Sequence, residues 1–119
     1  MTIGGYGLLL TLITVLGLSV GQILFKLAAS DLPKAGDWTL STLFSKWLVV
    51  AFAVYCASTV SWVLALRVTP LRLAYPIAAL GFVVVPVLAH YVLGEPFKIN
   101  TFIGSMVIVA GVLISVWSS

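Results

Sequence analysis

An amide and an ammonium group interrupt the first apolar run of the chain and are its clearest candidates for ligand binding. Gln22 and Lys26 are four residues apart, and Thr14 and Leu18 continue the same spacing. Side chains at this spacing share one face of an α-helix. Because polar groups facing lipid cost free energy, we expect this face to look into a protein interior. The alternative is structural, with Lys26 extending to the headgroups and Gln22 bonding to another helix.

Two arginines flank the short polar connection between the second and third apolar runs. Arg67 and Arg72 lie on either side of Pro70. Guanidinium groups fit phosphate well because each offers a planar fork of N–H donors. The pair predicts a phosphate site, and ordinary anchoring at the membrane surface is the alternative.

Aromatic side chains could complete a binding cavity. Tyr55 and Trp62 share a face of the second apolar run, and Tyr75 lies near the start of the third. Their rings are predicted to contact a ligand, although aromatic stripes also arise from helix packing alone.

Three residues predict a bend in the third apolar helix. Pro76 and Pro86 each lack a backbone N–H, and Gly81 lies between them. Such residues kink helices, and the kink could act as a hinge between two conformations.

No carboxylate interrupts an apolar run. The acids Asp31, Asp37 and Glu95 all fall in connecting segments. A proton-coupled cation exporter needs an acid inside the membrane, so this pattern argues against one. His90, near the end of the third run, is interpreted as an interfacial histidine rather than a proton relay. With no nucleophile beside a base and no cluster of metal ligands, the sequence predicts neither an enzyme nor a metal or cofactor site.

The composition of the chain indicates that membrane-spanning helices position these groups. The 119 residues are 62% hydrophobic and 8% charged, whereas soluble domains carry roughly 25% charged residues. A single all-α domain over residues 1–119 is predicted, because a spanning helix needs about 20 mainly apolar residues. Four segments qualify: about 6–29, 47–66, 73–93 and 101–117.

The connecting segments carry the charge of the chain. The net charge of +3 is small and lies mostly in or beside the loops, so nucleic acid is not an expected partner, whereas membrane lipid is. Between the first two spans, Asp37 could cap a short interfacial helix over residues 38–44.

Glycines predict close helix contacts in the last span. Gly104 and Gly111 are seven residues apart and share a face, and small residues let membrane helices approach closely. Four helices can hardly enclose a transport pathway, so at least a dimer is expected, with the last span at its interface.

Four stretches together resemble the drug/metabolite transporter superfamily in its small, four-helix form. Residues 21–26 resemble the end of helix one of that group, and residues 71–77 resemble the entry to its helix three. Residues 94–96 resemble the loop that follows helix three in EamA-type members, and residues 104–114 resemble helix four of the small multidrug resistance proteins. The resemblance covers nearly the whole chain and implies a bundle of this kind.

Two branches of the superfamily differ at helix one. Small multidrug resistance exporters carry a glutamate two turns before the lysine, and that position is Leu18 here. The small subunits of the aminoarabinose-phosphoundecaprenol flippase are more similar, through Gly21-Gln22, Lys26 and the segment 74–76. This resemblance implies a flippase in the bacterial inner membrane that moves an undecaprenyl-phosphate-linked sugar for lipid A modification.

The resemblance also implies a partner and leaves alternatives open. Small members of this superfamily form inverted pairs, so a homodimer or a heterodimer with a paralogous four-helix subunit is expected. The alternatives are an exporter of small molecules or organic cations, and a membrane subunit that stabilises its partner without transporting anything.

Overall fold

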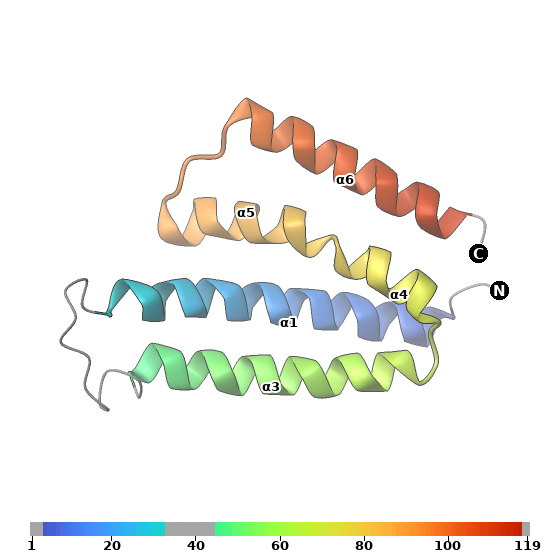
Figure 1. Ribbon diagram of the computed structural model, residues 1–119, viewed down its shortest axis with the longest axis horizontal. Coiled ribbons are helices and arrows are strands. Elements are labelled where there is room, and N and C mark those ends of the chain that lie inside the picture. The colour runs from blue at the N-terminus through green and yellow to red at the C-terminus, as the bar shows by residue number, and fades with distance from the viewer. Residues whose placement is uncertain (1–3, 33–44, 118–119) are drawn as a thin grey trace.

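The computed structural model describes residues 4–32 and 45–117, and every regular element in these ranges is a helix (Figure 1). The helices are α1 (Gly5–Ser30), α3 (Lys46–Leu66), α4 (Leu71–Ala78), α5 (Gly81–Leu93) and α6 (Ile99–Trp117). Taken with α4 and α5 as one, they supply four segments long and apolar enough to cross a membrane. The all-α, four-span expectation is confirmed, while the interfacial helix expected after Asp37 lies outside the described residues.

Local signals account for the ends of the helices. The Ser45 side chain caps α3 by accepting a hydrogen bond from the Leu48 N–H at 3.3 Å, which satisfies one of the free donors of the first turn. Gly94 ends α5 in the left-handed conformation, at φ 72°, where a side chain would be strained. The Glu95 N–H then donates to the Ala89 carbonyl at 3.2 Å.

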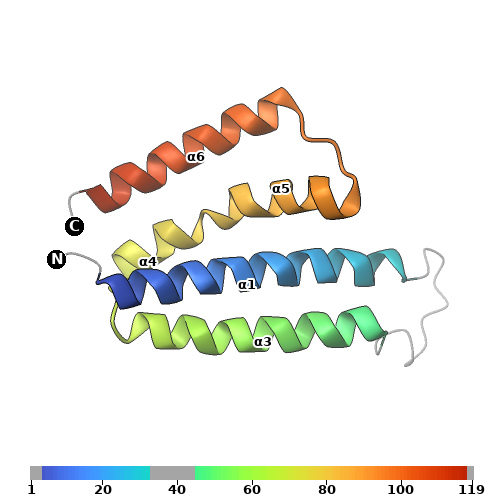
Figure 2. The ribbon, with the colours of Figure 1, turned by 180° about the vertical axis from the view of Figure 1, so that it is seen from behind.

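Helices α1 and α3 form an antiparallel pair joined through small and hydroxylated residues (Figures 1 and 2). Gly17 faces Ser58 so closely that a Cβ atom at Gly17 would overlap the serine hydroxyl, and a Cβ at Gly21 would lie 3.4 Å from the Tyr55 ring. The missing side chains therefore let the two backbones approach.

The buried hydroxyl groups of α1 donate their hydrogen bonds to carbonyl groups of their own helix. Thr11 and Ser19 donate to the carbonyls four residues earlier, each at 2.7 Å. Thr14 does the same to Leu10 at 2.8 Å and also contacts the Ser61 hydroxyl at 2.7 Å. Because a hydroxyl has one proton, Ser61 is the donor in the contact between the helices.

The third span is broken between α4 and α5, which confirms the expected kink. Ala79 and Leu80 separate the two helices, and the Phe82 N–H donates to Ala79 at 2.9 Å, three residues back. Such short-range bonds tighten the turn, as in a 3₁₀-helix. Pro76 lies inside α4 and Pro86 inside α5, so the two prolines flank the break.

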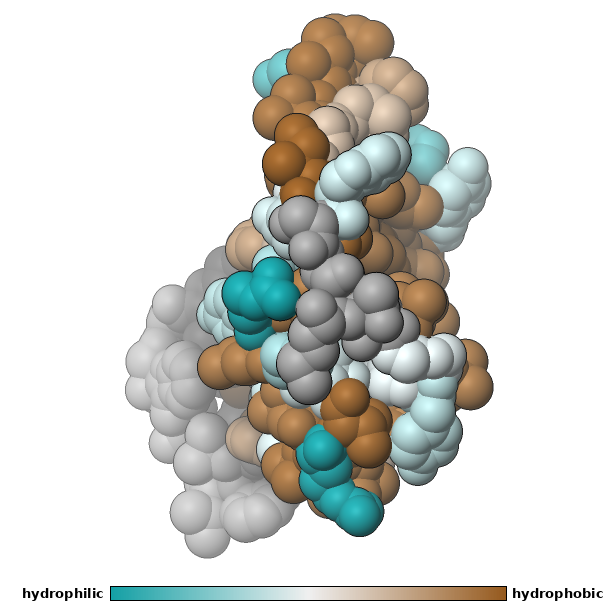
Figure 3. All heavy atoms as spheres, turned by 90° about the vertical axis from the view of Figure 1, so that its right-hand side faces the viewer, coloured by the Kyte–Doolittle hydropathy of each residue, from teal (hydrophilic) through white to brown (hydrophobic). Residues whose placement is uncertain are grey.

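Helix α6 packs mainly against α4 and α5, and in both ribbon views it diverges from them towards its own N-terminus (Figures 1 and 2). Ser105 and Val112 are its buried residues, and Val107 on another face is 66% exposed. Figure 3, which views the end where α3 meets α4, shows a mainly hydrophobic surface with few hydrophilic areas. Lipid or a second subunit is the environment that suits so much exposed apolar area.

Candidate functional site

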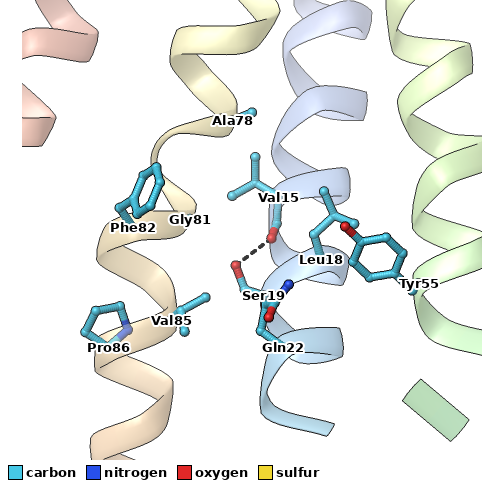
Figure 4. Close-up of a pocket in the computed structure, with 10 residues that line it drawn as sticks. All are labelled: Val15, Leu18, Ser19, Gln22, Tyr55, Ala78, Gly81, Phe82, Val85 and Pro86. Atoms are coloured by element: carbon cyan, nitrogen blue, oxygen red, sulfur yellow. Dashed lines mark hydrogen bonds between the residues drawn. The ribbon is translucent and has the colours of Figure 1, made fainter. Parts of the chain in front are cut away.

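A cavity of about 420 Å³ lies between the middle of α1, the middle of α3 and the α4–α5 break (Figure 4). Residues of α1, α3, α4 and α5 line it: Val15, Leu18, Ser19, Gln22, Tyr55, Ala78, Gly81, Phe82, Val85 and Pro86. The volume falls within the range of ordinary small-molecule sites, roughly 300–1,000 Å³. Its position near the centre of two spans places it deep in the membrane.

The lining is polar at a few points and carries no charged side chain. Ser19 donates to the Val15 carbonyl, drawn as the dashed line in Figure 4, so its oxygen remains free only as an acceptor. The side chains of Gln22 and Tyr55 form no hydrogen bond within the described residues and are exposed in the single chain. An amide without a partner at this depth is costly, so its partner must be a ligand, water or a second subunit.

The structure brings together part of the residue set that the sequence singles out. Gln22 and Tyr55 border the cavity together with Gly81 and Pro86, two of the three expected hinge residues. The expected polar face of α1 is divided. Thr14 is buried against α3, Leu18 and Gln22 reach the cavity, and Lys26 is exposed outside the lining.

The sequence did not single out five of the lining residues: Val15, Ser19, Ala78, Phe82 and Val85. Ser19 carried a signal that could have been read, since it precedes Gln22 by three residues and so lies near it on the helix. Ala78 and Phe82 flank the break, and the only signal for them in the sequence is that they lie close to Gly81.

Arg67 and Arg72 lie at the opposite end of the bundle from Lys26, around the α3–α4 connection. Both guanidinium groups are exposed, and no ion pair involves them within residues 4–32 and 45–117. Thr69 between them is 4% exposed, packs against Gly7 of α1, and has a hydroxyl with no hydrogen-bond partner in that part of the chain. Packing of Thr69 and backbone hydrogen bonds, such as that from the Val68 N–H to the Ala65 carbonyl at 3.2 Å, hold the turn.

The remaining candidates face outward. Tyr75 is 70% exposed and does not border the cavity, and Trp62 is half-buried, also outside the lining. In the part of the chain that the structure describes, a Cβ atom at Gly104 or Gly111 would meet nothing within 4 Å. These glycines thus serve no packing role inside the single chain.

The chain is similar over most of its length to several curated proteins. It is 35% identical over 107 residues to the probable 4-amino-4-deoxy-L-arabinose-phosphoundecaprenol flippase subunit ArnE of Pseudomonas aeruginosa strain UCBPP-PA14, covering 88% of this chain and 92% of that protein. It is 33% identical over 129 residues to the probable subunit ArnF of the same flippase from Shewanella sediminis, covering 95% and 89%. The ArnE relative of Pectobacterium atrosepticum is 33% identical, with 87% and 92% covered.

Neither a family model nor a solved structure matches the chain. The relatives nevertheless extend across all four spans, and a curated relative 35% identical over nearly its whole length identifies the family. This chain belongs to the family of the 4-amino-4-deoxy-L-arabinose-phosphoundecaprenol flippase subunits, ArnE and ArnF.

Proposed function

We propose that the chain is one subunit of a flippase that carries undecaprenyl-phosphate-linked aminoarabinose across the bacterial inner membrane. The observation that carries this proposal is the similarity, across all four spans, to proteins named as subunits of that flippase. The cavity beside Gln22 supports it, because it offers polar groups at mid-membrane depth without an acid for proton–cation exchange. The cargo is moved unchanged, and we assign the chain no enzymatic step.

The phosphate is proposed to meet the basic groups at the two membrane surfaces. Lys26 is exposed near the end of α1, and Arg67 and Arg72 are exposed at the opposite end of the bundle. A charge-assisted hydrogen bond from an ammonium or guanidinium group suits a phosphodiester oxygen. The prenyl chain stays in lipid, along the exposed apolar helices.

A second four-helix subunit is proposed to complete the pathway. If the partner inserts in the inverted orientation, Lys26 of this chain lies on the same membrane side as the basic α3–α4 turn of the partner. Each leaflet then has an anion site, which suits alternating access between the two sides. Homodimer and heterodimer are both compatible with this geometry.

Transport can be tested with the amino group of the cargo. A membrane-impermeant amine reagent labels the sugar only after it faces the periplasm. In cells that depend on this chain, Lys26→Ala should lower labelling roughly tenfold or more, the loss expected for one charge-assisted hydrogen bond. Lys46→Ala is the matched control, because Lys46 also lies at this end of the bundle but stacks on the Trp47 ring at 5.3 Å.

Unchanged labelling in a well-expressed Lys26→Ala strain would remove the proposed role of the lysine. Unchanged labelling after deletion of the whole gene, in a strain without a paralogue, would remove the flippase assignment itself.

A further inference from the structure

The break between α4 and α5 changes the hydrogen-bonding character of the cavity wall. Three amide groups of the break are used within the turn: Phe82 donates to Ala79 at 2.9 Å, and Val83 and Val84 donate to Leu80 at 2.9 and 3.0 Å. The Phe82, Val83 and Val84 donors at the start of α5 are therefore satisfied. Within the described residues the Gly81 N–H, the first of α5, has no backbone partner, so it is the donor of the break that is left for a ligand.

Carbonyl groups of the same turn lose their usual donors. In a regular helix the Phe82 N–H would bond to the Ala78 carbonyl, but it donates to Ala79 instead. Pro86 has no N–H, so the carbonyl of Phe82 lacks its partner four residues later. Ala78, Phe82 and Pro86 all line the cavity.

Free carbonyl groups inside a membrane need a partner. Unsatisfied polar groups are costly in hydrocarbon, so non-helical backbone at this depth is found where it lines a cavity. The Ser19 oxygen, which has already donated its proton, adds another acceptor to the wall. Gln22 and Tyr55 are the side chains that can donate, and each can also accept.

We infer that this cavity binds the sugar headgroup of the cargo through its hydroxyl and amino groups, while the phosphate stays outside; this inference rests on the proposed function. A sugar ring is rich in O–H and N–H donors, which can pair with the Ser19 oxygen and the free carbonyl groups of the break, the few acceptors of a mainly apolar lining. A phosphodiester offers only acceptors, so it could pair with the Gln22 and Tyr55 donors but with none of the carbonyl groups at the break. The basic residues that suit the phosphate, Lys26, Arg67 and Arg72, all lie outside the lining.

Pro86→Ala isolates the contribution of the backbone. Alanine restores an N–H that can bond to the Phe82 carbonyl, and it removes an acceptor from the cavity while favouring the helix. Pro76→Ala is the matched control, because the carbonyl it would satisfy belongs to Arg72, which does not border the cavity. Gln22→Leu removes the amide at similar volume and tests the side-chain contribution separately.

The experiment compares two lipids on the full-length chain, extracted in native nanodiscs with any subunit that accompanies it. The probes are undecaprenyl-phosphate-linked aminoarabinose and undecaprenyl phosphate, which lacks the sugar. The unmodified chain should bind the sugar-linked lipid about tenfold more tightly, the gain expected from a few net hydrogen bonds. Pro86→Ala and Gln22→Leu should reduce this preference without weakening binding of undecaprenyl phosphate, and Pro76→Ala should keep it.

Each contrary outcome has a distinct meaning. Equal binding of both lipids by the unmodified chain overturns the inference and leaves the proposed function standing. Full preference in both cavity variants also overturns it, as does a loss of undecaprenyl phosphate binding in them, which would place the phosphate in the cavity. Binding of neither lipid overturns the proposed function and the inference together.

Discussion

At the scale of single residues, buried hydroxyl groups show how differently the same side chain can contribute. Thr69 is buried, and its hydroxyl has no hydrogen-bond partner among residues 4–32 and 45–117, whereas Thr14 bonds both to Leu10 and to Ser61. Removing a buried polar group that has no partner can leave the stability of the fold unchanged or raise it. Removing one that has a partner lowers the stability, because the partner is left without a hydrogen bond.

Threonine-to-valine substitutions test this contrast because they keep the shape of the side chain. Thr14→Val should lower the free energy of unfolding by about 1 kcal/mol, since Ser61 loses its acceptor. Thr69→Val should leave stability unchanged or raise it. Thermal unfolding of the two purified variants checks both, and a larger loss for Thr69→Val than for Thr14→Val would contradict the account.

His90 is a further residue whose role is local. Its Nδ1 lies 2.8 Å from the Glu95 carbonyl oxygen, and because a carbonyl only accepts, Nδ1 carries the proton. The hydrogen bond ties the end of α5 to the connection that leads into α6, which gives His90 a local structural role.

His90→Phe keeps an aromatic ring and removes this bond. We expect a loss of about 1 kcal/mol in stability and faster hydrogen exchange at the amides of residues 94–98. Exchange rates identical to those of the unmodified chain would show that the turn is held by other contacts.

At the scale of the elements, the α1–α3 pair and the α4–α5 segment differ in how tightly they are built. Glycines of α1 bring α3 into close contact, as at Gly17 and Ser58, whereas a Cβ atom at Gly81 would lie 3.9 Å from the Ser19 oxygen, an ordinary distance. We therefore propose that the pair moves as one unit and that the broken segment bends against it.

Gly17→Ala should destabilise the fold by about 1–3 kcal/mol through overpacking against Ser58. Adding Ser58→Ala should recover part of that loss, because the overlapping oxygen is gone. Melting temperatures of the single and double variants measure the energetic coupling between the two substitutions. If their effects on stability were strictly additive, the two residues would not be in contact.

Gly81→Ala probes the proposed hinge instead. Space for the methyl group exists, and alanine favours helix over glycine by about 1 kcal/mol. We expect unchanged or higher thermal stability together with slower labelling of the transported sugar. Slower transport with a lowered melting temperature would point to misfolding rather than to a stiffened hinge.

The sequence predicted the elements better than it predicted their arrangement. Apolar run length alone predicts four spans, and Pro76 and Pro86 predict a bent third span. The place of Lys26 was harder, because helical spacing tells which face a residue shares but not how far along that face a cavity extends. Gln22 reaches the cavity, and Lys26, one turn later, does not.

At the scale of the whole molecule, α6 is the helix that one chain leaves least covered. Gly104 and Gly111 point into open space, and Val107 between them is largely exposed. A helix with glycines on its outer face is suited to close contact with another helix, so we keep this face as the proposed subunit interface.

Gly111→Leu tests that assignment, because leucine has room in the single chain and would hold two facing helices apart. We expect the fraction of cross-linked dimer in membranes to fall severalfold while the melting behaviour of the single chain is kept. Leucine at Gly4, which also has open space around it but lies outside the interface, is the control. Undiminished cross-linking in Gly111→Leu would exclude α6 from the interface.

The hydroxyl groups that bond back to their own helix also bear on how the chain enters the bilayer. The hydroxyl groups of Thr11 and Ser19 donate hydrogen bonds to carbonyl groups of α1 itself, so these bonds do not require α3. If α1 lies alone in the hydrocarbon of the bilayer, few of its side-chain donors therefore lack an acceptor. Insertion can proceed helix by helix during synthesis, and lateral association can follow later without any polar side chain first having to be released.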